Sequence, residues 1–532
     1  MLILTSIHNN KMKKIKRALI STYDKTNLVE LGKILTDYKI EILSTGGTAH
    51  CLREAGIDIR DISDYTGFPE MLDGRLKTLH PKIHGGLLAL RENSNHIAQT
   101  QEHGIQMIDM VVCNLYPFEA TVSDPDVELA SAIENIDIGG PTMIRSAAKN
   151  YQDVAVLTSS QQYADVIAEL TENDGCLSSK SRFDLAKAAF THTALYDKAI
   201  SNYLTGLDQK DVNMPEVLGL QYNKWQDLRY GENPHQSAAF YRAPTSAVPC
   251  VAWSEQLNGQ PLSYNNLLDL EAALEIVKDF PNPTCSVIKH NNPCGLATHT
   301  NLGQAFLDAL DCDRVSAFGS IVGFNKKVDL NTANLLREEA KAGIKIEAII
   351  APSFTSEALK QLSRVKTRRI LATGELVHDE SALHVRNITN GILVQSPDFH
   401  DLSEKDLQLV TSRKPTEDEM RSLFFSWKAC KHVKSNAILL VQGTKTVGIG
   451  AGQMSRVDSS IIAVRKAGDR AIGAVLASDA FFPFPDGVET AGKAGITAVI
   501  QPGGSVSDEA VIEMANKYDM AMVFTGVRHF KH

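Results

Sequence analysis

The sequence lacks several features that define whole classes of proteins. Its 532 residues contain no uninterrupted apolar stretch of about 18 residues, which excludes a conventional membrane-spanning helix. They contain no Walker A sequence, G-x-x-x-x-G-K-[ST], so ATP-driven chemistry is not indicated. No internal repeat or low-complexity segment is visible either. What remains is an ordinary globular composition, with 43% hydrophobic and 22% charged residues.

Excess positive charge and paired cysteines are also missing. A formal net charge of −9 gives no global field for a polyanion, so nucleic acid is not an expected partner. The eight cysteines include no C-x-x-C spacing, which favours reduced thiols in a cytosol. At the N-terminus an apolar stretch precedes a basic one, the wrong order for a secretory signal. We therefore expect a cytoplasmic protein that starts at Met1 or Met12 and binds no membrane.

The order of sequence patterns predicts several folded units, because one hydrophobic core stops growing well below this length. Residues 1–15 are expected to be a disordered extension. Residues 16–160 alternate short apolar runs with helical periodicity, which is typical of a βαβ domain with a parallel sheet. Residues 161–215 predict a helical connector, and residues 216–532 predict further α/β structure with a softer break near residue 415.

Individual elements can be assigned from the apolar runs. A helix is expected over residues 27–38, and another helical stretch over 181–204. The expected strands of the first domain are RALIST, YKIEIL, MIDMVVCNLY and DVAVLT, and those of the second region include CSVIKH, EAIIAP, AILLVQ and ITAVIQP.

Three clusters in the first domain could form a phosphate site. Strand YKIEIL leads into Ser44-Thr45-Gly46-Gly47-Thr48 and then a helix, which predicts either a phosphate-binding turn or a plain tight turn. GRLKTLHPKIHGG groups Arg75, Lys77 and His80 in a loop suited to anions. His80 and His84 could suggest a metal, but Pro81 disfavours a regular helix there and no third ligand is near.

The third cluster is NIDIGGPTMIRSAAKN. Pro141 suits the first turn of a helix, after two glycines that allow close backbone approach. Arg145 and Lys149 then lie one turn apart, either as a solvated basic stripe or with Lys149 placed to supply charge or a proton.

In the second region, VIKHNNPCG places Lys289 and His290 side by side at a strand end, where α/β proteins hold their chemistry. Histidine suits proton transfer near neutral pH. A zinc deaminase would need H-x-E and P-C-x-x-C, but Asn292 replaces the glutamate and no second cysteine follows Cys294. We therefore expect a site without metal.

Other segments of this region could contact a polar or flat ligand. LRYGENPHQ could grip a polar ligand or form an interdomain turn, and Asn436 stands at a strand start. The glycine run GIGAG fails as a dinucleotide fingerprint because Gln453 stands where glycine is required, yet it could approach a heterocycle. SDAFFPFPDG could form a slot for a planar ring or pack in the core. The ending RHFKH could be a phosphate clamp or a fraying basic tail.

Taken together, these motifs resemble one family. STGGTA, GRLKTLHP, CNLYPF, IDIGG, RSAAKN, LRYGENPHQ, KHNNPCG, GIGAGQ, SDAFFPF and the final RHFKH occur in the order seen in the bifunctional purine biosynthesis enzymes that join AICAR transformylase to IMP cyclohydrolase. The resemblance extends from about residue 16 to residue 532. It departs from the pattern only in about a dozen extra N-terminal residues.

The resemblance implies a fold and an active site for the first domain. The domain would be similar to methylglyoxal synthase and would perform the cyclohydrolase step, with Lys149, Lys77, Tyr116 and Asp137 as catalytic residues. The residues expected to bind the nucleotide are Tyr23, Asp24, Lys25, Thr45, Gly46, Gly47, Thr48, Arg75, Lys77, Thr78, Cys113, Asn114, Asp137 and Ile138.

For the second region, the resemblance implies two subdomains similar to cytidine deaminase but without its zinc. Lys289, His290 and Asn436 would be catalytic, and 10-formyltetrahydrofolate would be the co-substrate. Arg229, Tyr230, His290, Gly319, Asn436 and Arg528 would hold AICAR, the aminoimidazole carboxamide ribonucleotide, with Arg456, Phe481, Asp486 and Ser505 near the folate. The transformylase site is expected at a homodimer interface.

The implied function is formyl transfer to AICAR, giving FAICAR, followed by dehydrative closure of FAICAR to IMP. Two other classes share some of these features. A zinc-dependent deaminase would require bound metal. A nucleotide- or folate-sensing protein would bind both ligands without turnover, and a chain without His290 or Lys149 would have favoured that interpretation.

Overall fold

The protein is described by a computed structural model that covers residues 11–124, 126–208, 214–244, 246, 248–380 and 382–532. The chain divides into two compact units, Met1–Gly219 and Leu220–His532. Across the described ranges, no helix combines the length and apolar character needed to cross a membrane.

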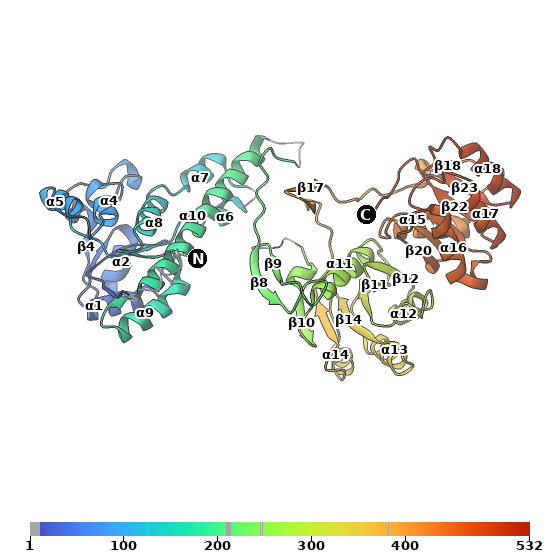
Figure 1. Ribbon diagram of the computed structural model, residues 1–532, viewed down its shortest axis with the longest axis horizontal. Coiled ribbons are helices and arrows are strands. Elements are labelled where there is room, and N and C mark those ends of the chain that lie inside the picture. Colours follow the sequence, from blue (N-terminus) through green and yellow to red (C-terminus); the bar gives the residue numbers. More distant parts are fainter. Residues whose placement is uncertain (1–10, 125, 209–213, 245, 247, 381) are drawn as a thin grey trace. The chain divides into compact units, whose positions relative to one another are not determined.

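The first unit consists of short strands and ten α-helices among its described residues (Figure 1). Its strands are β1 (Lys13–Lys14), β2 (Arg17–Ser21), β3 (Glu41–Ser44), β4 (Arg60–Asp61), β5 (Met110–Cys113), β6 (Ala155–Leu157) and β7 (Cys176–Leu177). Its helices are α1 (Leu28–Asp37), α2 (Gly46–Glu54), α3 (Ile62–Thr66), α4 (Pro81–Leu88), α5 (Ser94–Glu102), α6 (Phe118–Val122), α7 (Leu129–Glu134), α8 (Gly139–Lys149), α9 (Tyr163–Glu172) and α10 (Ser179–Asp208), with 3-10 turns η1 (Leu72–Gly74) and η2 (Ser160–Gln162).

A five-stranded parallel sheet, in the order β4-β3-β2-β5-β6, forms the centre of this unit. Except for the short edge strand β4, its strands are buried on both faces. Residues such as Leu19 and Val111 pack against α4, α8 and α10, whereas Ile20 and Val112 pack against α1, α2 and α9. Burial on both faces explains why these strands are continuous apolar runs in the sequence. The predicted parallel-sheet domain is confirmed.

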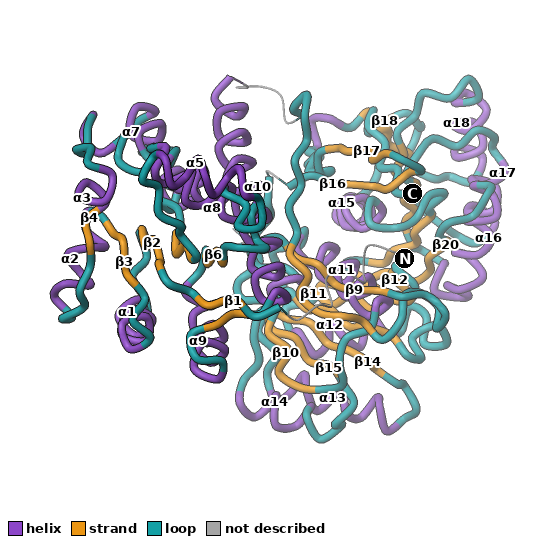
Figure 2. Tube along the Cα trace, turned by 60° about the vertical axis from the view of Figure 1, so that its left-hand side comes forward, coloured by secondary structure: helices purple, strands orange, loops and turns teal. Residues whose placement is uncertain are grey.

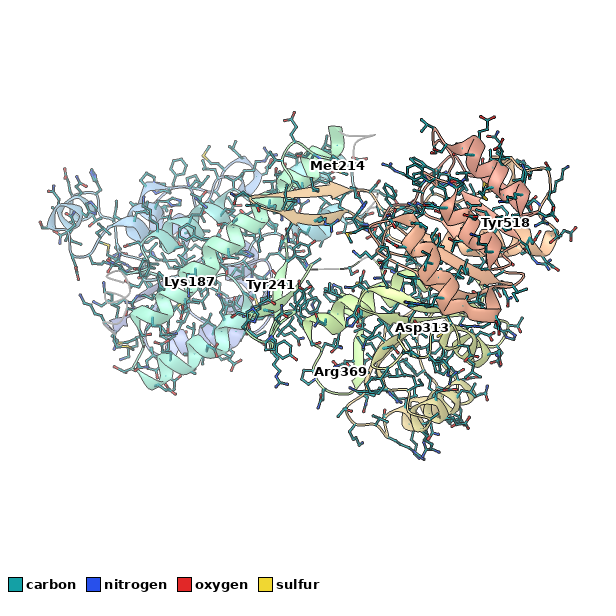
Figure 3. The ribbon with its side chains drawn as sticks, turned by 45° about the vertical axis from the view of Figure 1, so that its right-hand side comes forward. Lys187, Met214, Tyr241, Asp313, Arg369 and Tyr518 are labelled. Atoms are coloured by element: carbon teal, nitrogen blue, oxygen red, sulfur yellow. The ribbon has the colours of Figure 1, made fainter. Side chains whose placement is uncertain are left out.

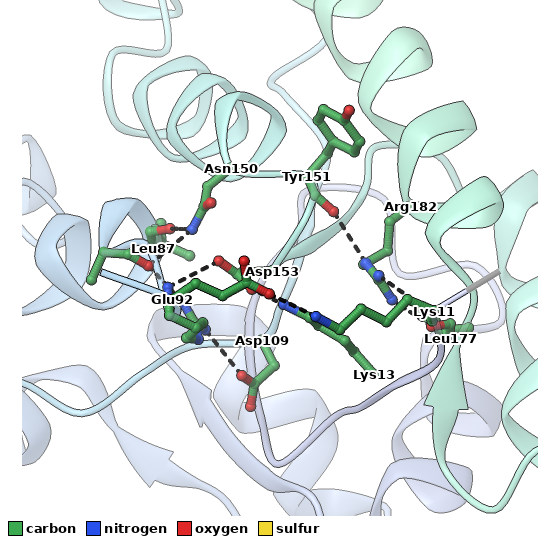
Figure 4. A network of polar contacts seen from close by, with 12 residues as sticks. Lys11, Lys13, Leu87, Glu92, Asp109, Asn150, Tyr151, Asp153, Leu177 and Arg182 are labelled. Atoms are coloured by element: carbon green, nitrogen blue, oxygen red, sulfur yellow. Dashed lines mark hydrogen bonds and ion pairs between the residues drawn. The ribbon is translucent and has the colours of Figure 1, made fainter. Parts of the chain in front are cut away.

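Part of the predicted N-terminal extension is ordered. Residues 1–10 lie outside the described residues, but β1 pairs with β7 and Ile15 is fully buried. Figure 4 shows the polar network behind this order, in which Lys13 pairs with Asp153, and Arg182 donates to the carbonyls of Tyr151 at 3.1 Å and Lys11 at 3.2 Å. The structured chain therefore begins before residue 16, because buried polar partners hold it.

The helices expected as a connector pack on the first unit. Leu170 of α9 and Leu185 of α10 join the core on one face of the sheet, and Ala189 and Tyr196 of α10 join the other. The connector therefore contributes to the core of this unit and, through Tyr196, to its site.

The second unit contains the remaining described elements. Its strands are β8 (Asn223–Leu228), β9 (Ala238–Arg242), β10 (Glu255–Asn258), β11 (Thr284–Lys289), β12 (Asn292–Thr298), β13 (Ser320–Phe324), β14 (Ile346–Ala351), β15 (Arg369–Ala372), β16 (His384–Ile388), β17 (Gly391–Gln395), β18 (Gln408–Leu409), β19 (Ile438–Gln442), β20 (Lys445–Gly450), β21 (Val475–Ser478), β22 (Ala498–Gln501) and β23 (Ala521–Phe524). Its helices are α11 (Tyr264–Lys278), α12 (Leu302–Leu310), α13 (Leu330–Lys341), α14 (Ser356–Leu362), α15 (Glu417–Cys430), α16 (Arg456–Ala467), α17 (Asp486–Lys493) and α18 (Asp508–Lys517), with 3-10 turns η3 (Val251–Trp253), η4 (Glu404–Asp406) and η5 (Gly468–Ala471).

A twelve-stranded mixed sheet runs through this unit (Figure 2). Its two halves have the same plan, namely an edge strand, a helix, an antiparallel hairpin and then three strands that alternate with helices. The spatial order β10-β15-β14-β13-β11-β12 of the first half is mirrored by β20-β19-β21-β22-β23-β18, and the halves meet where β12 pairs with β20. The expected pair of α/β subdomains is therefore present, and it is a structural repeat that the sequence did not reveal.

Two glycines of the GIGAG run allow helix α16 to pack on strand β20. A Cβ atom at Gly448 would lie 2.2 Å from the carbonyl oxygen of Ala463, and one at Gly450 would lie 1.9 Å from that of Ser459. Both carbonyls belong to α16, so glycine is required for this helix to lie directly on β20. The expected approach to a heterocycle does not explain these two positions.

Candidate functional sites

The loops after β2 and β5 meet at the carboxyl edge of the parallel sheet in the first unit. The side-chain oxygen of Asn114 accepts hydrogen bonds from the backbone N–H groups of Tyr23 at 2.6 Å and Asp24 at 3.0 Å, and its Nδ2 donates to the Asp24 carbonyl at 2.9 Å. The Tyr23 and Tyr116 rings meet edge to face, 5.6 Å between centroids. Asn114 thus joins the two loops, and the exposed tyrosines border the space above them.

The loop after β3 leads into the N-terminus of helix α2, a position that can bind an anion. Helix α2 begins at Gly46, whose φ of +53° favours glycine, and its first N–H groups are free to bind an anion. The ammonium group of Lys25 is close, since a Cβ atom at Gly47 would lie 3.9 Å from it. Thr48 has a structural role, because its buried hydroxyl bonds the backbone of Thr22 at 3.0 Å and 2.9 Å. Thr45 is the N-cap residue of the helix.

Arg75 lies in the loop before α4 and pairs with Glu134 of α7 through two hydrogen bonds, and both side chains are exposed. Three residues on, Thr78 is buried, and a Cβ atom at Gly139 would lie 2.8 Å from its hydroxyl. The GRLKTLHP loop therefore packs directly on the start of α8. His80 caps α4 by accepting the N–H of Lys82 at 3.1 Å, and His84 contacts Ser146 at 3.1 Å.

Asp137 is held at the start of α8 by two hydrogen bonds. Its Oδ1 accepts the N–H of Gly140 at 2.9 Å, and its own N–H donates to the Tyr196 hydroxyl at 2.8 Å. A Cβ atom at Gly140 would lie 2.5 Å from the carboxylate, which explains the second glycine of IDIGG. Burial raises the pKa of Asp137, while the Gly140 N–H and the nearby charge of Lys77 oppose the rise. A carboxyl group held in this way can exchange a proton with a ligand.

Two more of the predicted residues differ in exposure. Cys113 ends β5 and is buried, which raises the pKa of its thiol, whereas Ile138 is more than half exposed.

Lys149 is not brought to Asp137. It is the last residue of α8, about 15 Å along the helix from Gly139 at about 1.5 Å per residue, and its side chain is exposed. Its catalytic role stays a prediction that rests on the resemblance alone.

In the second unit, four segments from both halves of the sheet come together. Lys434 N–H donates to the Asn292 side chain at 3.0 Å, and the N–H groups of Ser435 and Gly452 donate to the carbonyls of Lys531 at 2.9 Å and Lys434 at 2.8 Å. His290 and Asn436, 146 positions apart, thus belong to one region, which also includes the C-terminal tail.

Asn436 is fixed by a buried network. Its Nδ2 donates to the carbonyls of Gln453 at 3.0 Å and Met454 at 3.3 Å, and its Oδ1 accepts from Arg456 at 2.7 Å. Arg456 is 6% exposed and also pairs with Asp479, which is fully buried. Arg456, expected near the folate, thus orients Asn436 with all of its described contacts inside the protein.

His290 and Lys289 end strand β11. His290 is exposed at the turn into β12 with a φ of +51°, and the Lys289 ammonium donates to the carbonyls of Phe318 at 2.9 Å and Gly319 at 3.3 Å. Gly319 has a φ of +73°, which brings its backbone to Lys289. The pair therefore presents one exposed imidazole and one ammonium held by carbonyl groups.

The remaining predicted residues line exposed surfaces. Arg229 lies 5.6 Å from the Tyr230 ring, and Arg528 lies 4.5 Å from the Phe530 ring. Phe482 of SDAFFPFPDG packs in the core, as one of the two interpretations expects. Phe481 is partly exposed, so a contact of this residue with a planar ring stays a prediction. Asp486 begins α17, and Ser505 precedes α18 with its hydroxyl bonded to the N–H of Ser507 at 3.1 Å.

No group of three or more His, Cys, Asp or Glu side chains in the described ranges is arranged to hold a metal ion. Near His290, the Cys294 thiol is buried and donates to the Val287 carbonyl at 3.3 Å. Burial raises the pKa of Cys294 to about 12, so it is protonated at neutral pH.

Several residues of these sites were missed by sequence reasoning. Tyr196, Glu134 and Asp479 contact predicted site residues from other elements, and Asp269 contacts Asn291, the residue after His290. Their local sequences carry no signal, because only tertiary packing brings them to the site.

The parallel sheet of the first unit ends in loops of the kind that can bind phosphate, and the second unit has a lysine, a histidine and a fixed amide at strand ends. These features are typical of an α/β enzyme that acts on small molecules. A family model described as AICARFT/IMPCHase bienzyme matches residues 147–466, and one described as an MGS-like domain matches residues 27–142. The chain therefore belongs to the AICARFT/IMPCHase bienzyme family.

Full-length relatives agree. The proteins described as "Bifunctional purine biosynthesis protein PurH" from Bacillus cereus (strain ATCC 10987 / NRS 248) and Bacillus anthracis are each 52% identical over 517 residues, which cover 97% of this chain and 100% of theirs. A solved structure described as "Crystal structure of ForH" is 34% identical over 36% of this chain and 100% of its own, with a TM-score of 0.32. The chain is a bifunctional purine biosynthesis enzyme, an AICAR formyltransferase and IMP cyclohydrolase, and it acts on small molecules with a folate-type formyl donor.

Proposed function

We propose that residues 16–160, with the connector helices of 161–215, carry the cyclohydrolase, and that residues 216–532 carry the transformylase. The formyl donor is 10-formyltetrahydrofolate, neither step requires a metal, and the enzyme is a cytoplasmic homodimer. The observation that carries this assignment is the convergence of His290, Asn436 and the C-terminal tail in one region of the second unit.

In the transformylase step, the 5-amino nitrogen of AICAR attacks the formyl carbon. A C–N bond forms as the bond from the formyl carbon to N10 of the folate breaks. His290 takes the amine proton, Lys289 assists departure of the folate nitrogen, and Asn436 orients the nucleotide. Arg229, Tyr230, Gly319 and Arg528 hold AICAR, and Phe481, Asp486 and Ser505 border the folate with Arg456 behind Asn436.

In the cyclohydrolase step, the carboxamide nitrogen of FAICAR attacks its formyl carbon and the oxygen leaves as water. The free N–H groups of α2, with Lys25 and Arg75, bind the phosphate. Asp137, Lys77, Tyr116 and Lys149 handle protons and the developing oxyanion. The partly buried carboxyl group of Asp137, which feels the charge of Lys77, is the observation that supports this role.

The homodimer is supported by exposed apolar surface on two hairpins of the second unit. Trp225 on β8 and Tyr241 on β9 are each more than half exposed. Tyr241 is labelled in Figure 3. Hairpin β16–β17 is a separate two-stranded sheet with exposed Ile388 and Leu393. An isolated hairpin is only marginally stable in water, so a second copy that covers these surfaces would stabilise them.

The test is an assay with AICAR and 10-formyltetrahydrofolate that follows tetrahydrofolate and IMP separately. His290→Ala should stop tetrahydrofolate release and leave conversion of added FAICAR intact. Lys77→Ala and Lys149→Ala should instead accumulate FAICAR. His299→Ala and Lys187→Ala, which change an exposed histidine and an exposed lysine elsewhere, should retain both activities. Binding of both substrates without turnover would reject the assignment.

A further inference from the structure

His290 and Asn291 form the two-residue turn of the hairpin β11–β12, in which Lys289 pairs with Asn292. Their φ values are +51° and +62°, as the type I′ turns that suit such hairpins require. Residues other than glycine adopt this left-handed conformation at some cost, so a contact from outside the hairpin can stabilise the turn.

Asp269 of α11 makes such a contact. Its Oδ1 accepts the backbone N–H of Asn291 at 2.7 Å. With its amide nitrogen turned toward these acceptors, Asn291 also donates from its side chain to the Leu268 carbonyl at 3.1 Å and to Asp269 at 3.2 Å. A single carboxylate thus binds both the backbone and the side chain of the residue after His290.

The groups that affect the pKa of Asp269 belong to this turn and to Lys289 before it. Burial raises the pKa of Asp269, while the backbone N–H groups of Asn291 and His290 and the charges of His290 and Lys289 oppose the rise. Hydrogen bonds to the ionised form offset the desolvation of the partly buried carboxyl group.

We propose that Asp269 is a positioning residue of the transformylase, which holds the 290–291 turn in its left-handed conformation and so directs the His290 imidazole at the amine. This inference rests on the proposed role of His290. Asp269 itself contacts neither substrate. A displacement of about 1 Å at a reacting group can lower a rate by about a hundredfold, so loss of this support acts on kcat.

The test compares Asp269→Ala with Asp269→Asn. The asparagine retains an oxygen that can accept the Asn291 N–H, whereas alanine removes the acceptor. We expect Asp269→Ala to lower transformylase kcat by at least about tenfold with the KM for AICAR within about threefold, and Asp269→Asn to stay within about threefold of wild type. Conversion of added FAICAR by the first unit measures the amount of active protein in the same preparation and should not change.

Two further measurements make the test specific. Hydrogen exchange in a peptide spanning residues 284–298 should accelerate in Asp269→Ala and stay near wild type in Asp269→Asn. Asp308→Ala, which removes an aspartate of α12 that pairs with Lys445, is the matched control and should change neither property.

A transformylase kcat within twofold of wild type in Asp269→Ala would overturn the proposal, as would an equal loss in the alanine and asparagine variants. If His290→Ala itself kept full transformylase activity, the proposed function would fail instead, whatever Asp269 does.

Discussion

The side-chain oxygen of Asn436 accepts a hydrogen bond from Nη2 of Arg456 at 2.7 Å, and the same guanidinium group bonds Ser478 at 2.8 Å and pairs with the buried Asp479. The orientation of the Asn436 amide is therefore set from inside the protein. Loss of this arginine would affect both the charge of the core and the geometry of the site.

We expect Arg456→Met to destabilise the protein by about 3–5 kcal/mol, because Asp479 would keep a buried charge without its partner. Transformylase activity should fall as Asn436 loses its orientation. Urea unfolding and steady-state assays measure the two effects. Arg465→Met, at an exposed arginine of the same helix, is the control, and equal stability of the two variants would contradict the expectation.

Asp137→Asn should remove a pH dependence of the protein's stability and lower its cyclohydrolase activity. The raised pKa of Asp137 means that the folded state binds more protons than the unfolded state just above the ordinary carboxyl range, so stability falls as pH rises through that window. Asparagine keeps an acceptor for the Gly140 N–H and removes this dependence, while cyclohydrolase activity should drop by at least about tenfold. Unfolding measured between pH 4 and pH 7 checks the slope, and parallel wild-type and variant curves would refute it.

Glu134→Gln should free Arg75 for the substrate phosphate. In the structure the guanidinium is paired with Glu134, so a phosphate must displace a carboxylate. We expect the KM for FAICAR to fall by up to about threefold with kcat unchanged, and Arg75→Gln to raise it by about tenfold. Glu128→Gln, at an exposed glutamate just before the same helix, should have no effect. A higher KM in Glu134→Gln would mean that the pair supports binding.

Gly140→Ala should damage the first site selectively. The added methyl group would lie 2.5 Å from Oδ2 of Asp137 and 2.6 Å from the Leu115 side chain, so one of them must move. We expect a loss of about 1–3 kcal/mol from overpacking, with cyclohydrolase activity reduced and transformylase activity retained.

Gly206→Ala is the matched control for this substitution. Gly206 lies in α10 with open space around it, and alanine there should stabilise by about 0.5–1 kcal/mol. Two variants that behave alike would show that the close approach to Asp137 does not matter.

Most elements near the sites follow from local sequence. The strands around RALIST and CSVIKH were predicted because both faces of each are buried, which makes a short continuous apolar run. The helix expected over 27–38 is α1, Leu28–Asp37. Histidine beside lysine at a strand end, and glycines before a helix, likewise indicated candidate chemistry from residue types and spacing alone.

The sequence by itself therefore determined the α/β class, the family and the segments that carry the chemistry, because periodicity and motif spacing are local properties. Only the tertiary structure decided the partners. The N–H of Thr284 donates to Asn325 at 2.8 Å and that of Ala437 to Asp479 at 3.1 Å, equivalent bonds in two halves whose sequences show no repeat. Pairing of β12 with β20 joins those halves and brings His290 and Asn436 into one region. Such contacts depend on which surfaces pack together, and residue spacing does not record that.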